Sequence, residues 1–183
     1  MNLRISSGLL RGRFIKVPDT GLRPTEEKVR SAFFNTIFSM INFENRNFLD
    51  VFSGSGIFAF EAVSRGFNSA FLIEQNRKAV NTIAVNSAEL NLEKSVKVLS
   101  ADAFSFNFAS LEEKFSAIFI DPPYALGDKM PELLDKIVDS GIAGEVCVIT
   151  VEGNSETLWR RDGWNMKTKK FGGTFLSVFY NWE

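Results

Sequence analysis

The chain has 183 residues, of which 45% are hydrophobic and 23% charged, and its formal net charge is −1. This composition is typical of an ordinary globular protein with enough apolar side chains for one core, so we expect a single domain over residues 1–183. The absence of histidine excludes Ser-His-Asp triads, histidine general bases and His-ligated metals, and the single cysteine excludes an internal disulfide.

The N-terminal end of the chain is basic. Residues 1–30 contain seven Lys or Arg and three acids, whereas the remainder contains 14 and 19, which suggests an anionic partner at this end. The opening MNLRISSGLLRGRF carries arginines where a signal peptide needs an apolar stretch, and no run approaches the roughly 18 apolar residues of a membrane span. We therefore expect a cytoplasmic protein without a membrane partner.

Two elements are predicted before residue 46. Residues 2–17 alternate in two short segments joined through glycines, which predicts a β-hairpin with its arginines facing outward. Thr25 is a natural N-cap, and apolar residues recur at helical spacing after it, so a helix is expected over about 25–42. Residues 1–45 would thus form a basic hairpin and helix, attached to a core of residues 46–183.

From residue 47 short apolar runs alternate with helical periods, which indicates a mostly parallel sheet with helices on both faces. After Gly153 we expect one short helix and then an antiparallel edge, hinged at Gly172-Gly173. The predicted strands are NFLDVF, SAFLIE, SVKVLS, FSAIFID, EVCVITVE, WNMKTKKF and TFLSVFYNW, and the helices of the core are 56–65, 77–91, a short one near 108–113, and 130–140.

Four consecutive strands of this predicted sheet end in, or are followed by, an acid: Asp50, Glu74, Asp102 and Asp121. In open parallel sheets, ligands bind outside the carboxyl ends of the strands, near the point where the strand order reverses. We therefore expect these four carboxylates to share one site.

The loop DVFSGSG contains Asp50, Phe52, Gly54 and Gly56 between a strand and a helix. Glycines there let backbone amides approach a ligand closely, although a dinucleotide fold or a simple tight turn gives the same pattern. Asp50 at the strand tip would repel a phosphate but would favour a cation. The pattern therefore favours S-adenosylmethionine (SAM), which carries a sulfonium and an ammonium group, over NAD.

The next two strand ends suit the rest of that cofactor. Glu74 lies at the end of the second strand, where a carboxylate can accept hydrogen bonds from both ribose hydroxyls. Asp102 can accept from the adenine amino group, and the amide of Ala103 would face a ring nitrogen.

The sequence FIDPPY, residues 119–124, ends the fourth strand with acceptors. Asp121 and a proline carbonyl can accept the two N–H protons of an exocyclic base amine, which makes its lone pair available for methylation. Pro122 and Pro123 fix the turn and remove N–H donors, and Tyr124 offers a face for a base rotated out of its stack.

These motifs, in this order, resemble a class I methyltransferase acting on amino nitrogens. The segment RISSGLLRGRFIKVPDTGLRPTEEKVRSAFFNTI further resembles the bacterial 16S ribosomal RNA guanine-N2 methyltransferase family, and the similarity covers essentially the whole chain. The resemblance implies SAM-dependent transfer to one guanine of 16S rRNA, on an assembled or assembling small ribosomal subunit, without a metal. It also implies RNA contacts by the basic arm, for which we name Arg4, Arg11, Arg13, Arg23 and Thr25.

Other functions stay open on the residues alone. An adenine-N6 methyltransferase shares the DPPY chemistry, but guanine presents N1–H and N2 as adjacent donors, which suit a carboxylate better. A nicotinamide-dependent oxidoreductase is disfavoured by Asp50, and a non-catalytic RNA-binding protein by the four intact acids. A cytosine-C5 enzyme needs a cysteine at the site, whereas Cys147 lies in another strand.

Overall fold

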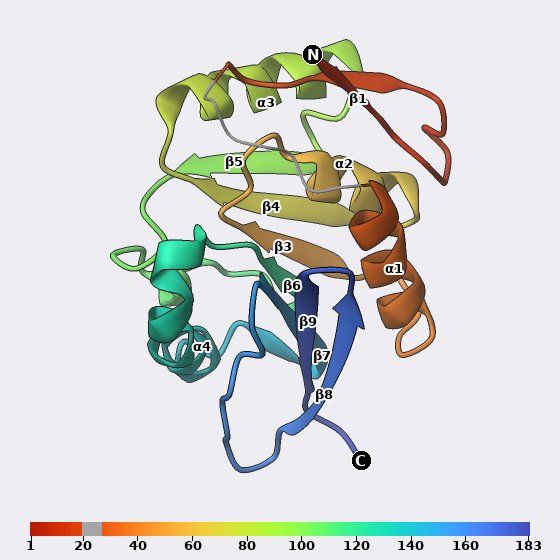
Figure 1. Cartoon of the computed structure of the whole chain (residues 1–183). Helices are drawn as coiled ribbons and strands as arrows, with labels where there is room; N and C mark the ends of the chain where they lie inside the picture. Colours follow the sequence, from red (N-terminus) through yellow and green to blue (C-terminus); the bar gives the residue numbers. More distant parts are fainter. Residues whose placement is uncertain (20–26) are drawn as a thin grey trace.

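The computed structural model describes residues 1–19 and 27–183. Its main element is a seven-stranded sheet (Figure 1). The predictions for Arg23 and Thr25, and for a helix start near residue 25, lie outside the described residues. In chain order the strands of this sheet are β3 (Asn47–Val51), β4 (Ser69–Glu74), β5 (Val96–Ser100), β6 (Phe115–Ile120), β7 (Ala143–Gly153), β8 (Asn165–Phe171) and β9 (Thr174–Tyr180).

The strand order is β5-β4-β3-β6-β7-β9-β8. The strands from β5 to β7 are parallel, and β9 is antiparallel to both β7 and β8. This confirms the mostly parallel sheet with an antiparallel C-terminal edge. The chain moves outward from β3 to β5 and then returns to place β6 beside β3, so the strand order reverses between β3 and β6. That reversal marks the expected ligand position in such sheets.

Helices cover both faces of the sheet, as predicted (Figure 1). On one face the core is rich in phenylalanine: Phe33 and Phe34 pack with Phe48 and Phe58, and the rings of Phe58 and Phe119 stack 3.8 Å apart. That face is covered by α1 (Glu27–Phe38), α2 (Ile57–Ser64) and α3 (Arg77–Glu89). The other face is covered by the 3₁₀ turn η1 (Phe108–Ser110) and by α4 (Met130–Asp139). A second 3₁₀ turn, η2 (Tyr124–Lys129), directly precedes α4.

The predicted N-terminal hairpin is present as β1 (Asn2–Arg4) and β2 (Phe14–Lys16), which pair antiparallel. Its turn is fixed to the end of α2, because the amide of Leu9 donates to the carbonyl of Ser64 at 2.7 Å. Gly8 has a φ of +81°, and a Cβ there would lie 1.8 Å from that carbonyl oxygen. Only glycine fits at this contact.

A buried ion pair joins this hairpin to the helices. Glu61 of α2 is fully buried, and its Oε1 accepts from the amide of Ser6 at 2.7 Å and from Nε of Arg30 at 3.2 Å. Its Oε2 accepts from Nε of Arg65 at 3.0 Å. Arg30, which is 1% exposed, also donates to the carbonyl of Arg4 at 3.1 Å. One residue of the basic N-terminal end therefore has a structural role.

The short helix predicted after Gly153 is wrong, because the described residues 154–164 contain no helix. Tertiary contacts hold this segment in an irregular path. The indole Nε1 of Trp159 donates to Asp135 at 3.0 Å, and the amide of Thr157 donates to Oγ of Ser177 at 2.8 Å. Near 108–113 the helix is reduced to the three-residue turn η1. None of the helices in the described part of the chain is long and apolar enough to cross a membrane.

Candidate active site

The four predicted acids lie at one edge of the sheet, because β3, β4, β5 and β6 run parallel and end together. Asp50 and Glu74 lie within β3 and β4 near their ends, Asp102 follows β5, and Asp121 directly follows β6. The amide of Asp121 donates to the carbonyl of Val51 at 3.3 Å, which holds the β6 corner against β3. The acids thus stand beside the point of strand reversal.

Asp50 is the most deeply buried of these acids, with 1% of its surface exposed. Among the described residues, no hydrogen-bond partner reaches its Oδ2. Burial first, and then the charges of Asp121 and Glu74, raise the pKa of Asp50 well above its usual value, against a smaller lowering by the amide of Ala59. An ionised carboxylate in this position requires a compensating cation. The site therefore fits a positively charged ligand.

The glycine-containing loop after β3 has an unusual backbone, which its glycines accommodate. Phe52, Gly54 and Gly56 all have positive φ, at 64°, 54° and 75°. A Cβ on Gly56 would lie 3.0 Å from the side chain of Leu72, so glycine allows α2 to begin close against β4. At Gly54 a Cβ would meet nothing within 4 Å, so its requirement is conformational rather than steric.

Glu74 organises the two loops beside it. Its Oε2 accepts from the amide of Gly54 at 2.8 Å, and its Oε1 accepts from the amide of Asn76 at 2.7 Å. Asn76 in turn caps the N-terminus of α3 through its side-chain oxygen. Glu74 is 7% exposed, and each carboxylate oxygen can accept more than one hydrogen bond. A ribose contact would therefore add to these bonds.

Asp102 and Ala103 form the corner after β5. The Oδ1 of Asp102 accepts from the amides of Phe104 and Ser105 at 2.9 and 3.0 Å, which closes a tight turn. Asp102 is exposed, whereas Ala103 is 3% exposed. The ring of Phe104 lies 6.0 Å from that of Phe52 in the glycine-containing loop. The corner thus combines an exposed carboxylate with aromatic surface, as an adenine site needs.

The DPPY corner continues into η2. Pro122 is buried and Asp121 is partly buried, whereas the Tyr124 side chain is 64% exposed. The carbonyl of Pro123 accepts from the amide of Leu126 at 2.8 Å within η2. The Pro122 carbonyl is therefore the better candidate acceptor for a base amine, and the exposed Tyr124 ring remains accessible for stacking.

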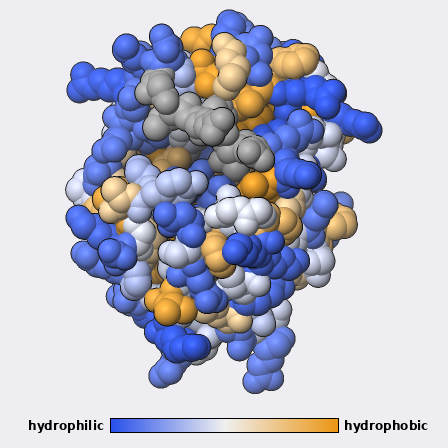
Figure 2. Space-filling view, in the orientation of Figure 1, coloured by the Kyte–Doolittle hydropathy of each residue, from blue (hydrophilic) through white to orange (hydrophobic). Residues whose placement is uncertain are grey.

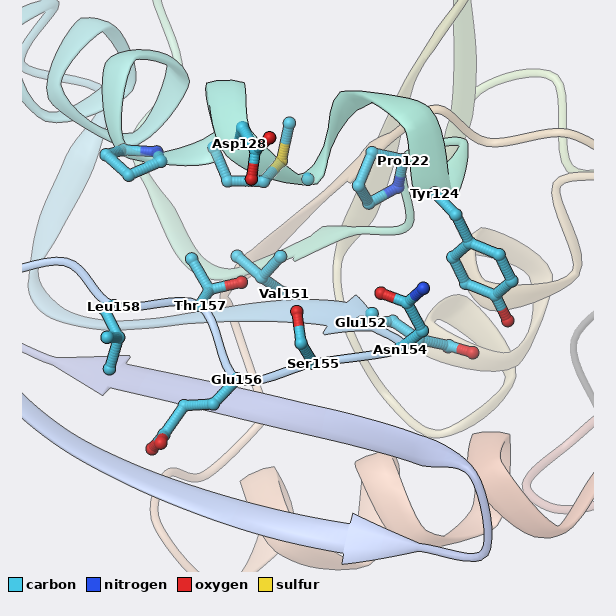
Figure 3. Close-up of a pocket in the computed structure, with 14 residues that line it drawn as sticks. Pro122, Tyr124, Asp128, Val151, Glu152, Asn154, Ser155, Glu156, Thr157 and Leu158 are labelled. Atoms are coloured by element: carbon cyan, nitrogen blue, oxygen red, sulfur yellow. The ribbon is translucent and has the colours of Figure 1, made fainter.

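Beside this corner lies a pocket of about 260 Å³ (Figure 3). Pro122 and Tyr124 line one side of it, and the end of β7 and the following loop line the other, with Glu152 and Asn154 pointing toward the side where Tyr124 lies (Figure 3). The exposed Leu158 also lines it. The lining combines the Tyr124 ring and apolar side chains with polar groups and the acids Asp128, Glu152 and Glu156, so it offers both a stacking surface and hydrogen-bond acceptors to a nucleobase.

Glu152 is the residue of this pocket that the sequence analysis missed. It is 6% exposed, no partner among the described residues reaches its Oε2, and burial, followed by the charge of Asp121, raises its pKa to about 8. A sequence signal for it existed, since EVCVITVE is a fifth parallel strand and also ends in an acid. In contrast, Cys147 lies buried in the middle of β7, and burial raises the pKa of its thiol to about 12.

The arginines of the hairpin lie apart from this edge. Arg4, Arg11 and Arg13 are exposed, and Arg4 is 3.9 Å from Glu27. The turn that carries Arg11 and Arg13 contacts Ser64 at the C-terminal end of α2, about 12 Å along the helix from the glycine-containing loop. The face shown in Figure 2 is mostly hydrophilic. These arginines therefore lie outside the pocket.

Within residues 1–19 and 27–183, no group of three or more His, Cys, Asp or Glu side chains could hold a metal ion.

The sheet order, the glycine-containing loop and the acids at the strand ends define the fold of a class I methyltransferase. The solved structure of yhhF from Escherichia coli, described as a candidate methyltransferase, superposes with a TM-score of 0.84 at 30% identity, and the match covers 99% of this chain and 98% of that one.

Sequence comparison identifies the family to which the chain belongs. The family model described as Conserved hypothetical protein 95 matches residues 3–180, and the chain belongs to this family. Ribosomal RNA small subunit methyltransferase D of Escherichia coli strain K12 is 35% identical over 184 residues, which covers 99% of this chain and 90% of that protein. A Thermus thermophilus protein of 26% identity has a TM-score of 0.77, with coverage of 96% and 98%. The family predicted from the N-terminal segment and DPPY is thus confirmed.

Proposed function

We propose that the protein transfers the methyl group of SAM to the exocyclic N2 amine of one guanine in 16S ribosomal RNA. Methylation of ribosomal RNA is supported by the 35% identity, over nearly the whole chain, to a small-subunit rRNA methyltransferase. The finer choice of guanine N2 is supported by the acceptor groups of the DPPY corner. The substrate would be the small ribosomal subunit or an assembly intermediate, in the cytoplasm.

The observation that carries this proposal is the buried Asp50 carboxyl beside Asp121 and Glu74. Three acids gathered at one edge, with no partner for Asp50 Oδ2 among the described residues, favour a ligand that carries positive charge. SAM supplies a cationic sulfonium that activates its methyl group. A nicotinamide dinucleotide would instead bring pyrophosphate charge toward Asp50.

The residues around Asp50 would hold the rest of the cofactor. The loop with Phe52, Gly54 and Gly56 would surround its amino acid part, and Glu74 would accept from the ribose hydroxyls. Asp102 and Ala103 would contact the adenine, beside the Phe52 and Phe104 rings.

At the DPPY corner, Asp121 and the Pro122 carbonyl would each accept one N–H of the target amine. These two acceptors would draw the amine nitrogen toward tetrahedral geometry and stabilise the positive charge that develops on it during methyl transfer. Pro123 sets the backbone direction, and Tyr124 would stack on the flipped base.

The arm of residues 1–45 and the core of residues 46–183 would act as one methyltransferase domain. The Arg30–Glu61 pair and the hydrogen bonds of the hairpin to Ser64 and Asn86 support this. Arg4, Arg11, Arg13, Arg23 and Thr25 would contact RNA outside the base pocket.

A methyl-transfer assay tests the proposal. The purified protein receives labelled SAM with unmodified free 16S RNA, unmodified small subunits or DNA in separate reactions, and the labelled nucleotide is mapped by digestion and mass spectrometry. The expected product is one N2-methylguanosine in 16S RNA. Label on adenine N6 or in DNA would contradict the guanine assignment, and the absence of any transfer would contradict the proposed function.

A further inference from the structure

Glu152 is the fifth acid at this edge of the sheet, and it lies beside Asp121 on the neighbouring strand. In the parallel β6–β7 pair, Ile120 is opposite Val151, so Asp121 and Glu152 are the next residues on the two strands. Neighbouring strands lie about 4.8 Å apart. The charge of Asp121 raises the pKa of Glu152, which agrees with this proximity.

A purely structural role does not account for this side chain. Buried carboxylates that stabilise a fold are normally paired or hydrogen-bonded, as Glu61 is by Ser6 and Arg30. Glu152 is comparably buried, but its Oε2 has no partner among the described residues. It also lines the pocket that contains Pro122 and Tyr124 (Figure 3).

The hydrogen-bonding edge of guanine offers two donors that two neighbouring carboxyls can accept. It presents the N1–H and the N2 amino group as neighbouring donors. Asp121 and the Pro122 carbonyl would serve only the amine, and a buried N1–H without an acceptor would carry an energetic penalty. Two neighbouring acidic side chains match two neighbouring donors.

We propose that Glu152 is a specificity-determining residue that accepts the N1–H of the target guanine while Asp121 accepts from its N2 amine. This inference rests on the proposed function, since it names the group that selects guanine at that same site. When Glu152 is ionised, adenine would be rejected because its N1 is an acceptor and would face a second acceptor at Glu152.

The test compares guanine with 2-aminopurine, which keeps the amine but has an acceptor at N1. Small subunits are reconstituted with either base at the nucleotide mapped for the wild-type protein, and kcat/KM is measured at about pH 9, above the Glu152 pKa of about 8, where this carboxyl is mostly ionised. The variants are Glu152→Gln, Glu152→Ala and the control Glu145→Gln, which makes the same change at an exposed position of β7. Calorimetric SAM binding checks that each variant is folded.

The wild-type protein and Glu145→Gln should prefer guanine by about tenfold or more, the size expected of a well-placed base contact. Glu152→Gln should narrow the preference mainly by gaining activity on 2-aminopurine, because its amide can donate to that N1 and can also accept from the guanine N1–H. Glu152→Ala should narrow the preference for guanine over 2-aminopurine by losing activity on guanine, since alanine can neither accept from nor donate to the base.

Equal losses on both bases, or an unchanged preference in both variants, would overturn the role of Glu152 while leaving the proposed function intact. If the wild-type protein methylates no guanine N2 during the mapping step, the proposed function fails, and this inference fails with it. The two failures are distinguishable because the first is seen only in the variants and the second in the wild-type protein.

Discussion

The buried carboxylate of Glu61 should be among the largest single contributors to the stability of the fold. In Glu61→Ala the Arg30 guanidinium, which is 1% exposed, loses its counter-ion, and the amide of Ser6 and Nε of Arg65 lose their acceptor. Removal of one partner from a buried ion pair costs about 3–5 kcal/mol. Since a domain is stable by only about 5–15 kcal/mol, the variant should lose a large fraction of its stability.

Urea denaturation followed by tryptophan fluorescence measures this loss as a lower midpoint. The matched control is Glu89→Ala, which removes the ion pair of the same hairpin through Lys16 at an exposed position, where the Glu89 side chain is 52% exposed. Exposed pairs contribute about 0–1 kcal/mol. If Glu61→Ala loses no more stability than Glu89→Ala, the buried pair does not hold the hairpin to the core as described.

Four further predictions concern the site. Asp121→Ala should abolish most methyl transfer and leave SAM affinity nearly unchanged in calorimetry; a matching loss of both would place this acid on the cofactor instead. Glu74→Ala should weaken SAM binding by about 1.5–3 kcal/mol, the value of a charged hydrogen bond, and an unaltered affinity would remove it from the ribose. The Glu152 pKa of about 8, raised from 4.5 mainly by burial, means that the folded state keeps a proton that the unfolded state releases above about pH 4.5. Wild-type stability should therefore fall between these two pH values, by on the order of a few kcal/mol, and the fall should be smaller in Glu152→Gln; parallel pH curves for the two proteins would refute this. Charge removal at Arg11 and Arg13 should weaken RNA binding and flatten its salt dependence, whereas an identical slope would show that they do not contact phosphates.

The sheet was predictable from the sequence because the residues of each strand show by themselves whether one face or both faces of that strand are buried. Runs such as AFLI and AIFI are apolar on both faces, which indicates parallel strands between two layers of helices. The meeting of Asp50, Glu74, Asp102 and Asp121 followed from the same prediction, since parallel strands end at one edge. Residue type and local spacing were sufficient for both conclusions.

The partners that meet from distant parts of the chain required the tertiary structure. Sequence reasoning expected a helix after Gly153, but Trp159 is held by Asp135 of α4, a contact that no local pattern reports. It counted Arg30 with the basic end, whereas the fold buries it against Glu61. It also missed Glu152, whose significance depends on lying next to Asp121 in the β6–β7 register.

The physical reason is one of range. Hydrophobic periodicity is set by neighbours along a single strand or helix, and it therefore determined the elements, their order along the chain and the acidic ends of the strands. Charge pairing and burial of carboxyls depend on which elements pack together, and only the folded chain decided that Arg30 is structural and that Glu152 belongs to the site.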